Sequence, residues 1–267
     1  MPRRCGKRVT ASLGASLFLI PLGLAMLGAC SGAAVPTQAP QQPLGLMTSL
    51  PLYWPEGTDI ADLAAGRAAV PWQRAAIEQD YAIVPLDTLS PIPALSPDAP
   101  EVDPLAGLAR LALIQPRGLS PADNVALDAW VRAGGRLLLA LDPALTGDYA
   151  APLGDPRRPV DGALIPPVVA RWGLTVSFDA EQAAVVTTAK FGAATATATA
   201  LPLALAGRIA VTDPVAACTV LAGGAAATCM VGKGRVTLVA DAALFEHAEL
   251  AGEDGATLRS MLSATFE

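Results

Sequence analysis

The sequence predicts an α/β fold with a mainly parallel sheet, helices on both faces of that sheet, and antiparallel β-hairpins in the C-terminal half. Residues 109–114 and 136–141 indicate the parallel sheet, because both runs are apolar without alternation, as in strands buried on both faces. The Ala/Thr-rich stretch 183–205 indicates the hairpins, because its β-branched residues favour strands over a helix.

The N-terminal half alternates short apolar runs with helical or turn-rich sequence. A first strand is expected at 44–52, a helix at 72–79 and a second strand at 81–86. The segment 91–104 holds five prolines, which are incompatible with regular structure, and it is therefore a predicted surface loop. The third strand is the buried run 109–114.

The clearest helix begins at Ser120, which is its expected N-cap. Pro121 lies in the first turn, and Asp123 completes a capping-box pattern. Gly134 ends this helix, and the buried strand 136–141 follows directly. Strand, helix and strand with short joints form a βαβ unit, whose crossover is expected to be right-handed.

The C-terminal half carries most of the expected antiparallel structure. The main domain is predicted to span 44–267 and to contain a β-rich insertion at about 179–231. The remaining expected elements are a helix at 166–172, a strand at 174–178, hairpins within 183–205, a turn at 232–234, a buried strand at 235–240 and a helix at 256–266.

Two short motifs of this sequence are distinctive. One runs from Leu119 through the paired glycines at 134–135 to Pro143, and the other runs from Gly232 to Phe245. Together they resemble auxiliary components of gliding-motility-type ABC transport systems. The resemblance implies a flavodoxin-like domain related in fold to class I glutamine amidotransferases. True amidotransferases carry a nucleophilic cysteine in a glycine-flanked elbow, which neither Cys218 nor Cys229 provides. The resemblance therefore implies this fold without glutaminase activity.

The first thirty residues have the order of a secretory signal. A basic start is followed by an apolar run at 13–29, which is short and interrupted by Pro21. The run closes with Leu-Gly-Ala before Cys30, which resembles the lipobox of bacterial lipoproteins. In that family the signal is cut before the cysteine, whose thiol is acylated. We therefore expect a signal peptide at 1–29, a lipid such as palmitate on Cys30, and an uncharged flexible tether at 30–43.

Export and lipidation predict a periplasmic protein held to a membrane by its lipid. Ser31 follows the cysteine in place of the Asp that retains enterobacterial lipoproteins at the inner membrane, so the outer membrane is favoured. Cleavage before Cys30 leaves 14 basic and 24 acidic residues, a formal charge of −10. Such a surface repels polyanions, which excludes nucleic acid as a partner and leaves the membrane and other envelope proteins.

Cys218 and Cys229 are an isolated pair in a chain bound for an oxidising compartment. Both lie in β-favouring sequence, with the turn Gly223-Gly224 between them. We predict a disulfide that clamps a hairpin; two reduced buried thiols are the alternative.

Four residues are candidates for a ligand-binding site. Asp142 and Asp241 each end a strand expected to be parallel in one sheet, so both carboxylates would lie at one crevice. They could perform acid–base chemistry, or each could cap the turn that follows it. Ser49 and Trp54 follow the first strand at the same edge, where the indole could stack on a sugar or shield the core.

No recognised catalytic, metal or cofactor motif occurs in the sequence. It has no P-loop, dinucleotide fingerprint or Gly-x-Ser-x-Gly elbow, and its one histidine, His247, has no partner at metal-ligand spacing. We therefore expect no cofactor, no metal and no enzymatic activity.

The expected function is a lipid-anchored, non-catalytic binding or scaffolding protein of the periplasm, and the resemblance implies an auxiliary role in an ABC-type envelope transport system. One alternative is an envelope-polymer hydrolase that uses Asp142 and Asp241. Another is a small-ligand binding protein, which would need a pocket near Trp54.

Overall fold

The computed structural model describes residues 41–94, 96, 98–192 and 199–267. The expected signal peptide, Cys30 and the tether up to residue 40 lie outside these ranges. The described chain belongs to one compact unit. Within it, no helix combines the length and apolar character needed to cross a membrane.

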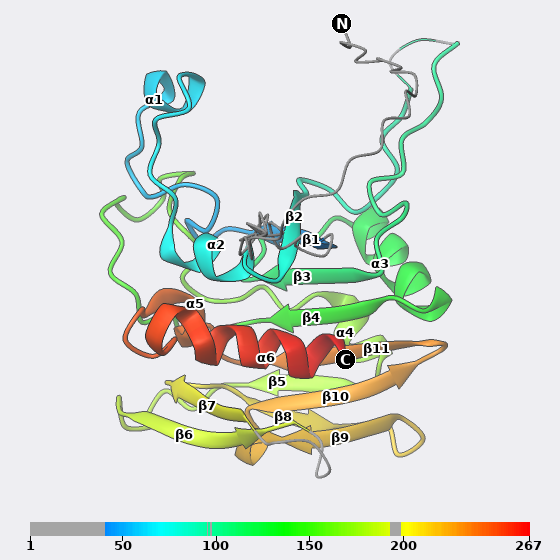
Figure 1. Cartoon of the computed structure of the whole chain (residues 1–267). Coiled ribbons are helices and arrows are strands. Elements are labelled where there is room, and N and C mark those ends of the chain that lie inside the picture. The colour runs from blue at the N-terminus through cyan, green and yellow to red at the C-terminus, as the bar shows by residue number, and fades with distance from the viewer. Residues whose placement is uncertain (1–40, 95, 97, 193–198) are drawn as a thin grey trace, which may run out of the picture. The chain divides into compact units, whose positions relative to one another are not determined.

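A seven-stranded sheet forms the centre of this unit (Figure 1). Its strand order is β2-β1-β3-β4-β11-β10-β9. The first five of these strands are parallel to one another, whereas β10 is antiparallel to both of its neighbours. The predicted mainly parallel α/β architecture is confirmed. The strands are β1 (Gln42–Thr48), β2 (Tyr81–Pro85), β3 (Arg110–Ile114), β4 (Arg136–Ala140), β9 (Ala217–Leu221), β10 (Ala226–Val231) and β11 (Gly234–Val239).

Strand β1 ends at Thr48, four residues before the expected end at 52. The chain turns here because the N–H and Oγ–H of Ser49 both donate to the carbonyl oxygen of Gln115, at 3.1 and 2.6 Å. The Thr48 Oγ1 also accepts the Leu50 N–H at 3.0 Å, which closes the turn. Leu50 and Leu52 are nevertheless buried, which explains why their sequence resembles a continued strand.

Helices pack on both faces of the sheet. On one face, α2 (Trp72–Ile77) and α6 (Ala256–Phe266) share a hydrophobic cluster with strand residues such as Leu46 and Leu138. On the other, α3 (Pro121–Ala133) and α4 (Pro167–Arg171) share a second cluster with residues such as Leu113 and Leu139. Alternate residues of the same strands thus pack into two separate hydrophobic cores, one on each face of the sheet, as expected for strands buried on both faces. Two short helices, α1 (Ile60–Ala64) and α5 (Ala243–Glu246), lie in the connections.

The predicted capping box of α3 is confirmed. The Ser120 Oγ accepts the Asp123 N–H and the Asp123 Oδ2 accepts the Ser120 N–H, both at 3.1 Å. The other carboxylate oxygen, Oδ1, accepts the N–H groups of Leu89 and Ser90, at 2.8 and 2.9 Å. One acidic residue therefore begins the helix and fastens the loop that follows β2.

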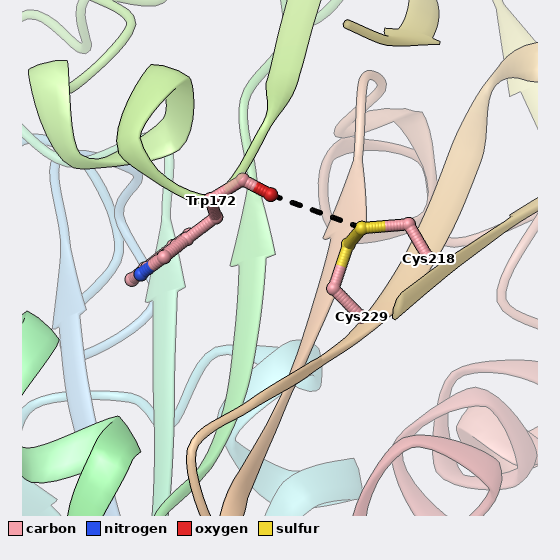
Figure 2. Close-up of a disulfide and its surroundings, with 3 residues drawn as sticks. All are labelled: Trp172, Cys218 and Cys229. Atoms are coloured by element: carbon pink, nitrogen blue, oxygen red, sulfur yellow. Dashed lines mark hydrogen bonds between the residues drawn. A yellow bond between two sulfur atoms is a disulfide. The ribbon is translucent and has the colours of Figure 1, made fainter. Parts of the chain in front are cut away.

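Antiparallel strands complete the C-terminal half. Two pairs of strands form separate two-stranded sheets. One pair is β5 (Leu174–Ser177) with β8 (Arg208–Val211), and the other is β6 (Val186–Phe191) with β7 (Thr199–Ala204). Strands β9 and β10 instead continue the main sheet as a hairpin. Cys218 and Cys229 face each other across this hairpin, with their Cα atoms 4.0 Å apart, and are joined by a disulfide (Figure 2).

Candidate functional site

The carboxyl ends of the parallel strands bring the candidate residues to one edge of the sheet. Ser49 follows β1, Asp142 follows β4 and Asp241 follows β11. Between them, Gln115 follows β3. This is the edge at which open α/β sheets bind ligands.

Asp142 is fully buried, and both of its carboxylate oxygens accept backbone hydrogen bonds. The Ala144 N–H donates to Oδ1 and the Ala242 N–H donates to Oδ2, each at 2.8 Å. The first contact caps the turn after β4, and the second ties that turn to the end of the neighbouring strand β11. The side chain thus has a complete structural role.

Asp241 has the same arrangement and is only 3% exposed. Its Oδ1 accepts the Ala243 N–H and its Oδ2 accepts the Ala204 N–H, both at 2.7 Å. The second contact fastens the end of β7 to the main sheet. Of the two sequence interpretations, capping and acid–base chemistry, these contacts correspond to capping.

Burial changes the titration of both carboxyl groups. Desolvation raises the pKa of Asp142 to about 6, against the lowering effect of its two backbone hydrogen bonds. Desolvation, together with the neighbouring negative charge of Asp142, raises the pKa of Asp241 to about 8. At neutral pH the folded chain therefore keeps the proton of Asp241 and, below about pH 6, that of Asp142 as well, whereas the unfolded chain releases both near the ordinary value of 3.8.

We expect the free energy of unfolding to fall as the pH rises from 5 to 8.5. Because both folded-state pKa values lie above the ordinary value of 3.8, the folded state binds more protons across this range. The stabilisation is complete below about pH 4 and is lost as the pH passes through the folded values. Urea unfolding midpoints at pH 5, 7 and 8.5 check this, and a midpoint that is unchanged or higher at pH 8.5 would contradict it.

Gln115 connects the loops at this edge of the sheet through its side-chain hydrogen bonds, and the sequence did not predict this role. Its buried side chain donates to the carbonyl oxygens of Asp142 and Val160, at 3.0 and 2.7 Å, and accepts the Asp142 N–H at 2.8 Å. Its backbone has a φ of 44°, which is rare for a residue with a side chain. A single polar residue directly after a buried strand was the only available signal.

A cavity of about 550 Å³, here called the Trp54 pocket, lies between the loop after β1 and the loop after β4. Its volume is within the range of small-ligand sites. Ser49 and Trp54 both line it, as a site at this edge requires, whereas Asp142 and Asp241 do not. The lining also includes Leu50, Tyr53, Glu56, Thr58, Leu63, Ala150, Ala151, Arg157 and four prolines, Pro51, Pro55, Pro152 and Pro159.

Glu56 joins the two walls of the pocket. Its carboxylate oxygens accept the N–H groups of Ala150 and Ala151, at 3.0 and 2.7 Å. The Arg158 Nη1 also donates to the Ala151 carbonyl oxygen at 2.7 Å. The walls are therefore held by hydrogen bonds within the chain, and the cavity is preformed.

Trp54 is the most exposed aromatic residue of the pocket, at 44%. The guanidinium carbon of Arg74 lies 5.1 Å from the centre of its ring, within cation–π range. The neighbouring Tyr53 is instead fixed, because its hydroxyl donates to the Leu46 carbonyl oxygen. Burial raises the pKa of Tyr53 to about 12, so this hydroxyl keeps its proton at physiological pH.

The remaining sequence candidates lie apart from the pocket. The His247 Nε2 lies 2.9 Å from the Thr146 Oγ1. Among the described residues, no group of three His, Cys, Asp or Glu side chains is placed to hold a metal ion. The disulfide Cys218–Cys229 has a packing role, since Cys229 is buried in the second core and the Cys218 Sγ lies 3.9 Å from the Trp172 carbonyl oxygen (Figure 2).

No family model and no curated protein matches this chain. Similar solved structures include a β-galactosidase from Rahnella sp. R3, with 15% identity over 84% of this chain and 32% of that one, at a TM-score of 0.42. The exo-β-1,4-mannosidase Op5Man5 from Opitutaceae bacterium strain TAV5 has 14% identity over 85% of this chain and 36% of that one, at 0.45. The mmIFT52 N-terminal domain has 11% identity over 85% of this chain and 97% of that one, at a TM-score of 0.47. The chain spans about a third of the two glycosidases, and likenesses at these TM-scores assign no function to it.

Proposed function

We propose that this chain is a lipid-anchored periplasmic binding protein, without catalytic activity, that holds its ligand in the Trp54 pocket. The observation that carries the proposal is the pocket itself. It is a preformed cavity at the carboxyl edge of a parallel sheet, and it contains an exposed tryptophan. This combines the expected binding role with the small-ligand alternative, which required a cavity near this residue.

The arrangement of the carboxylates supports binding over hydrolysis. A hydrolase acting through Asp142 and Asp241 needs both side chains open to substrate and to water. Here all four of their oxygens accept backbone N–H groups, and neither residue lines the pocket. The proposal therefore gives these two residues a structural role only.

The two motifs that resemble gliding-motility-type ABC transport components suggest the setting of this binding role. The proposal is an auxiliary component of an envelope transport system, with a domain of the flavodoxin-like or class I glutamine amidotransferase-like type. A parallel sheet covered by helices on both faces supports this finer fold assignment. The lipid on Cys30 would hold the domain at the membrane, with the outer membrane favoured over the inner.

A photocrosslinking amino acid placed in the pocket tests binding. With benzoylphenylalanine in place of Thr58, which lines the pocket, we expect irradiation of intact cells to give an adduct of defined mass. Val125 is 71% exposed on α3 and outside the pocket lining, so benzoylphenylalanine there is the matched control and should not give this adduct. The absence of a pocket-specific adduct would overturn the binding proposal.

The same cells test anchoring. In a Cys30→Ala chain we expect the protein to lose its lipid, observed as the loss of metabolic palmitate labelling. If palmitate labelling were the same with and without Cys30, the anchoring part of the proposal would be wrong. The crosslinking result from the pocket is read separately, so the two parts fail independently.

A further inference from the structure

The single carboxylate in the lining of the Trp54 pocket, that of Glu56, is already engaged in hydrogen bonds. Both carboxylate oxygens of Glu56 accept backbone N–H groups, and the Ser49 Oγ accepts the Val160 N–H at 3.2 Å while donating to Gln115. The hydroxyls of Thr58 and Tyr53 use their protons within the chain, because they donate to the carbonyl oxygens of Pro55 and Leu46. A ligand that must donate hydrogen bonds therefore finds no free carboxylate among these side chains.

Two donors in the lining remain available. The Trp54 indole N–H makes no hydrogen bond to the described residues, although the side chain is partly exposed. Arg157 uses its Nε and Nη2 to hold Asp155, at 3.0 and 2.6 Å, and its Nη1 has no partner in the described chain. The pocket is thus complementary to a ligand that accepts hydrogen bonds.

The rest of the lining is apolar and rigid. Four prolines contribute to it, with the buried Leu50 and the half-buried Leu63. Pyrrolidine rings and an indole ring are stiff surfaces that lose little conformational entropy when a ligand packs on them. A ligand with compact, stiff apolar rings fits such walls better than a flexible chain does.

We propose that the Trp54 pocket binds a proline-rich peptide segment of an envelope protein, in the extended polyproline II conformation; this rests on the proposed binding function and specifies its ligand. Each proline carries a carbonyl acceptor and no N–H donor, which matches a lining that has two free donors and an engaged carboxylate. The polyproline II backbone has no internal hydrogen bonds, so its carbonyl groups are free to accept. Aromatic-lined grooves are the usual receptors of such segments.

Two other ligand classes fit this lining less well. A saccharide presents many hydroxyl donors and needs acceptors, whereas Glu56 is already engaged. An acyl chain would cover the apolar walls and leave the donors of Trp54 and Arg157 unpaired, which is costly where they become buried. Both classes serve as competing outcomes in the experiment.

Fluorescence polarisation of a labelled octaproline peptide, titrated with the full chain in lipid nanodiscs, tests the inference. We expect saturable binding of octaproline and none of a labelled alanine–glutamine octapeptide. Trp54→Phe keeps an aromatic ring but removes the N–H. It should weaken binding about fivefold, which corresponds to the net free energy of one hydrogen bond. Trp54→Ala should weaken it at least tenfold. Ile60→Ala is the control, since Ile60 is 81% exposed on the neighbouring α1 and outside the pocket lining.

Three outcomes would overturn the inference. Equal affinity of Trp54→Phe and the original chain would remove the hydrogen-bond argument. If an N-acetylglucosamine oligomer or lauric acid competed through Trp54 while octaproline did not bind, the ligand class would be wrong, although the binding function would stand. If none of these probes bound and the crosslinker at Thr58 gave no adduct, the inference and the proposed function would fail together.

Discussion

Replacing Gly234 by alanine should destabilise the fold by at least about 3 kcal/mol, at the upper end of the usual cost of overpacking. A Cβ at this position would lie 2.0 Å from the Val131 carbonyl oxygen and 2.4 Å from that of Gly135. Both are backbone atoms, at the end of α3 and the start of β4, and neither can rotate away. Denaturant unfolding of the variant, followed by circular dichroism, measures the loss.

Lys233 in the same turn provides the matched control. Its side chain is exposed, and only its backbone N–H, which alanine retains, bonds to the Arg132 carbonyl oxygen at 3.0 Å. Lys233→Ala should change stability by less than about 0.5 kcal/mol. If Gly234→Ala were tolerated as well as Lys233→Ala, the close approach of the β10–β11 turn to α3 would be wrong.

Asp142→Ala should cost about 3 kcal/mol of stability. The substitution leaves the buried N–H of Ala242 and the half-buried N–H of Ala144 without their acceptor, and a buried group of this kind costs about 1–3 kcal/mol. The measurement belongs at pH 5, below the pKa of about 6 of this carboxyl group. At that pH the group is mostly neutral in the folded state, so removing a buried charge offsets little of the loss.

Asp148→Ala, in the same loop, is the control for this substitution. Asp148 is exposed, and its replacement should leave the unfolding midpoint nearly unchanged. An Asp142→Ala chain as stable as the Asp148→Ala chain would mean that the carboxylate is not a structural cap. The expected loss also affects any test of hydrolysis, because inactivity of a chain without Asp142 and Asp241 would report unfolding as readily as lost chemistry.

The βαβ unit could be predicted from the sequence because its signals are local. Ser120, Pro121 and Asp123 begin α3 through contacts within three residues, and the glycine at 134 ends it, as the structure confirms. The apolar runs of β3 and β4 likewise contain their own signature of burial on both faces. The C-terminal helix at 256–266 was also correctly placed.

Where the structure differs from the sequence prediction, the cause is a contact between distant parts of the chain. Strand β1 stops at Thr48 because Ser49 bonds to Gln115, 66 residues away, and no local pattern signals that contact. The strand pairing of the main sheet is another example. The hairpin of β9 and β10 extends the parallel sheet through β11, whereas β6 and β7 form a sheet of their own.

The candidate site divides in the same way. The sequence by itself located Ser49, Trp54, Asp142 and Asp241 at one edge, because residues that follow parallel strands share that edge. It left open whether the two aspartates were open to a ligand. In the tertiary structure both aspartates accept hydrogen bonds from backbone N–H groups at the strand ends, because such groups need acceptors.

The sequence therefore determined the fold class and the edge of the sheet at which to look. Only the tertiary structure decided which side chains there face a cavity, because the walls of the Trp54 pocket come from loops about a hundred residues apart. Glu56 closes them through Ala151, 95 residues further along the chain, and contacts over such separations depend on the packing of the whole sheet.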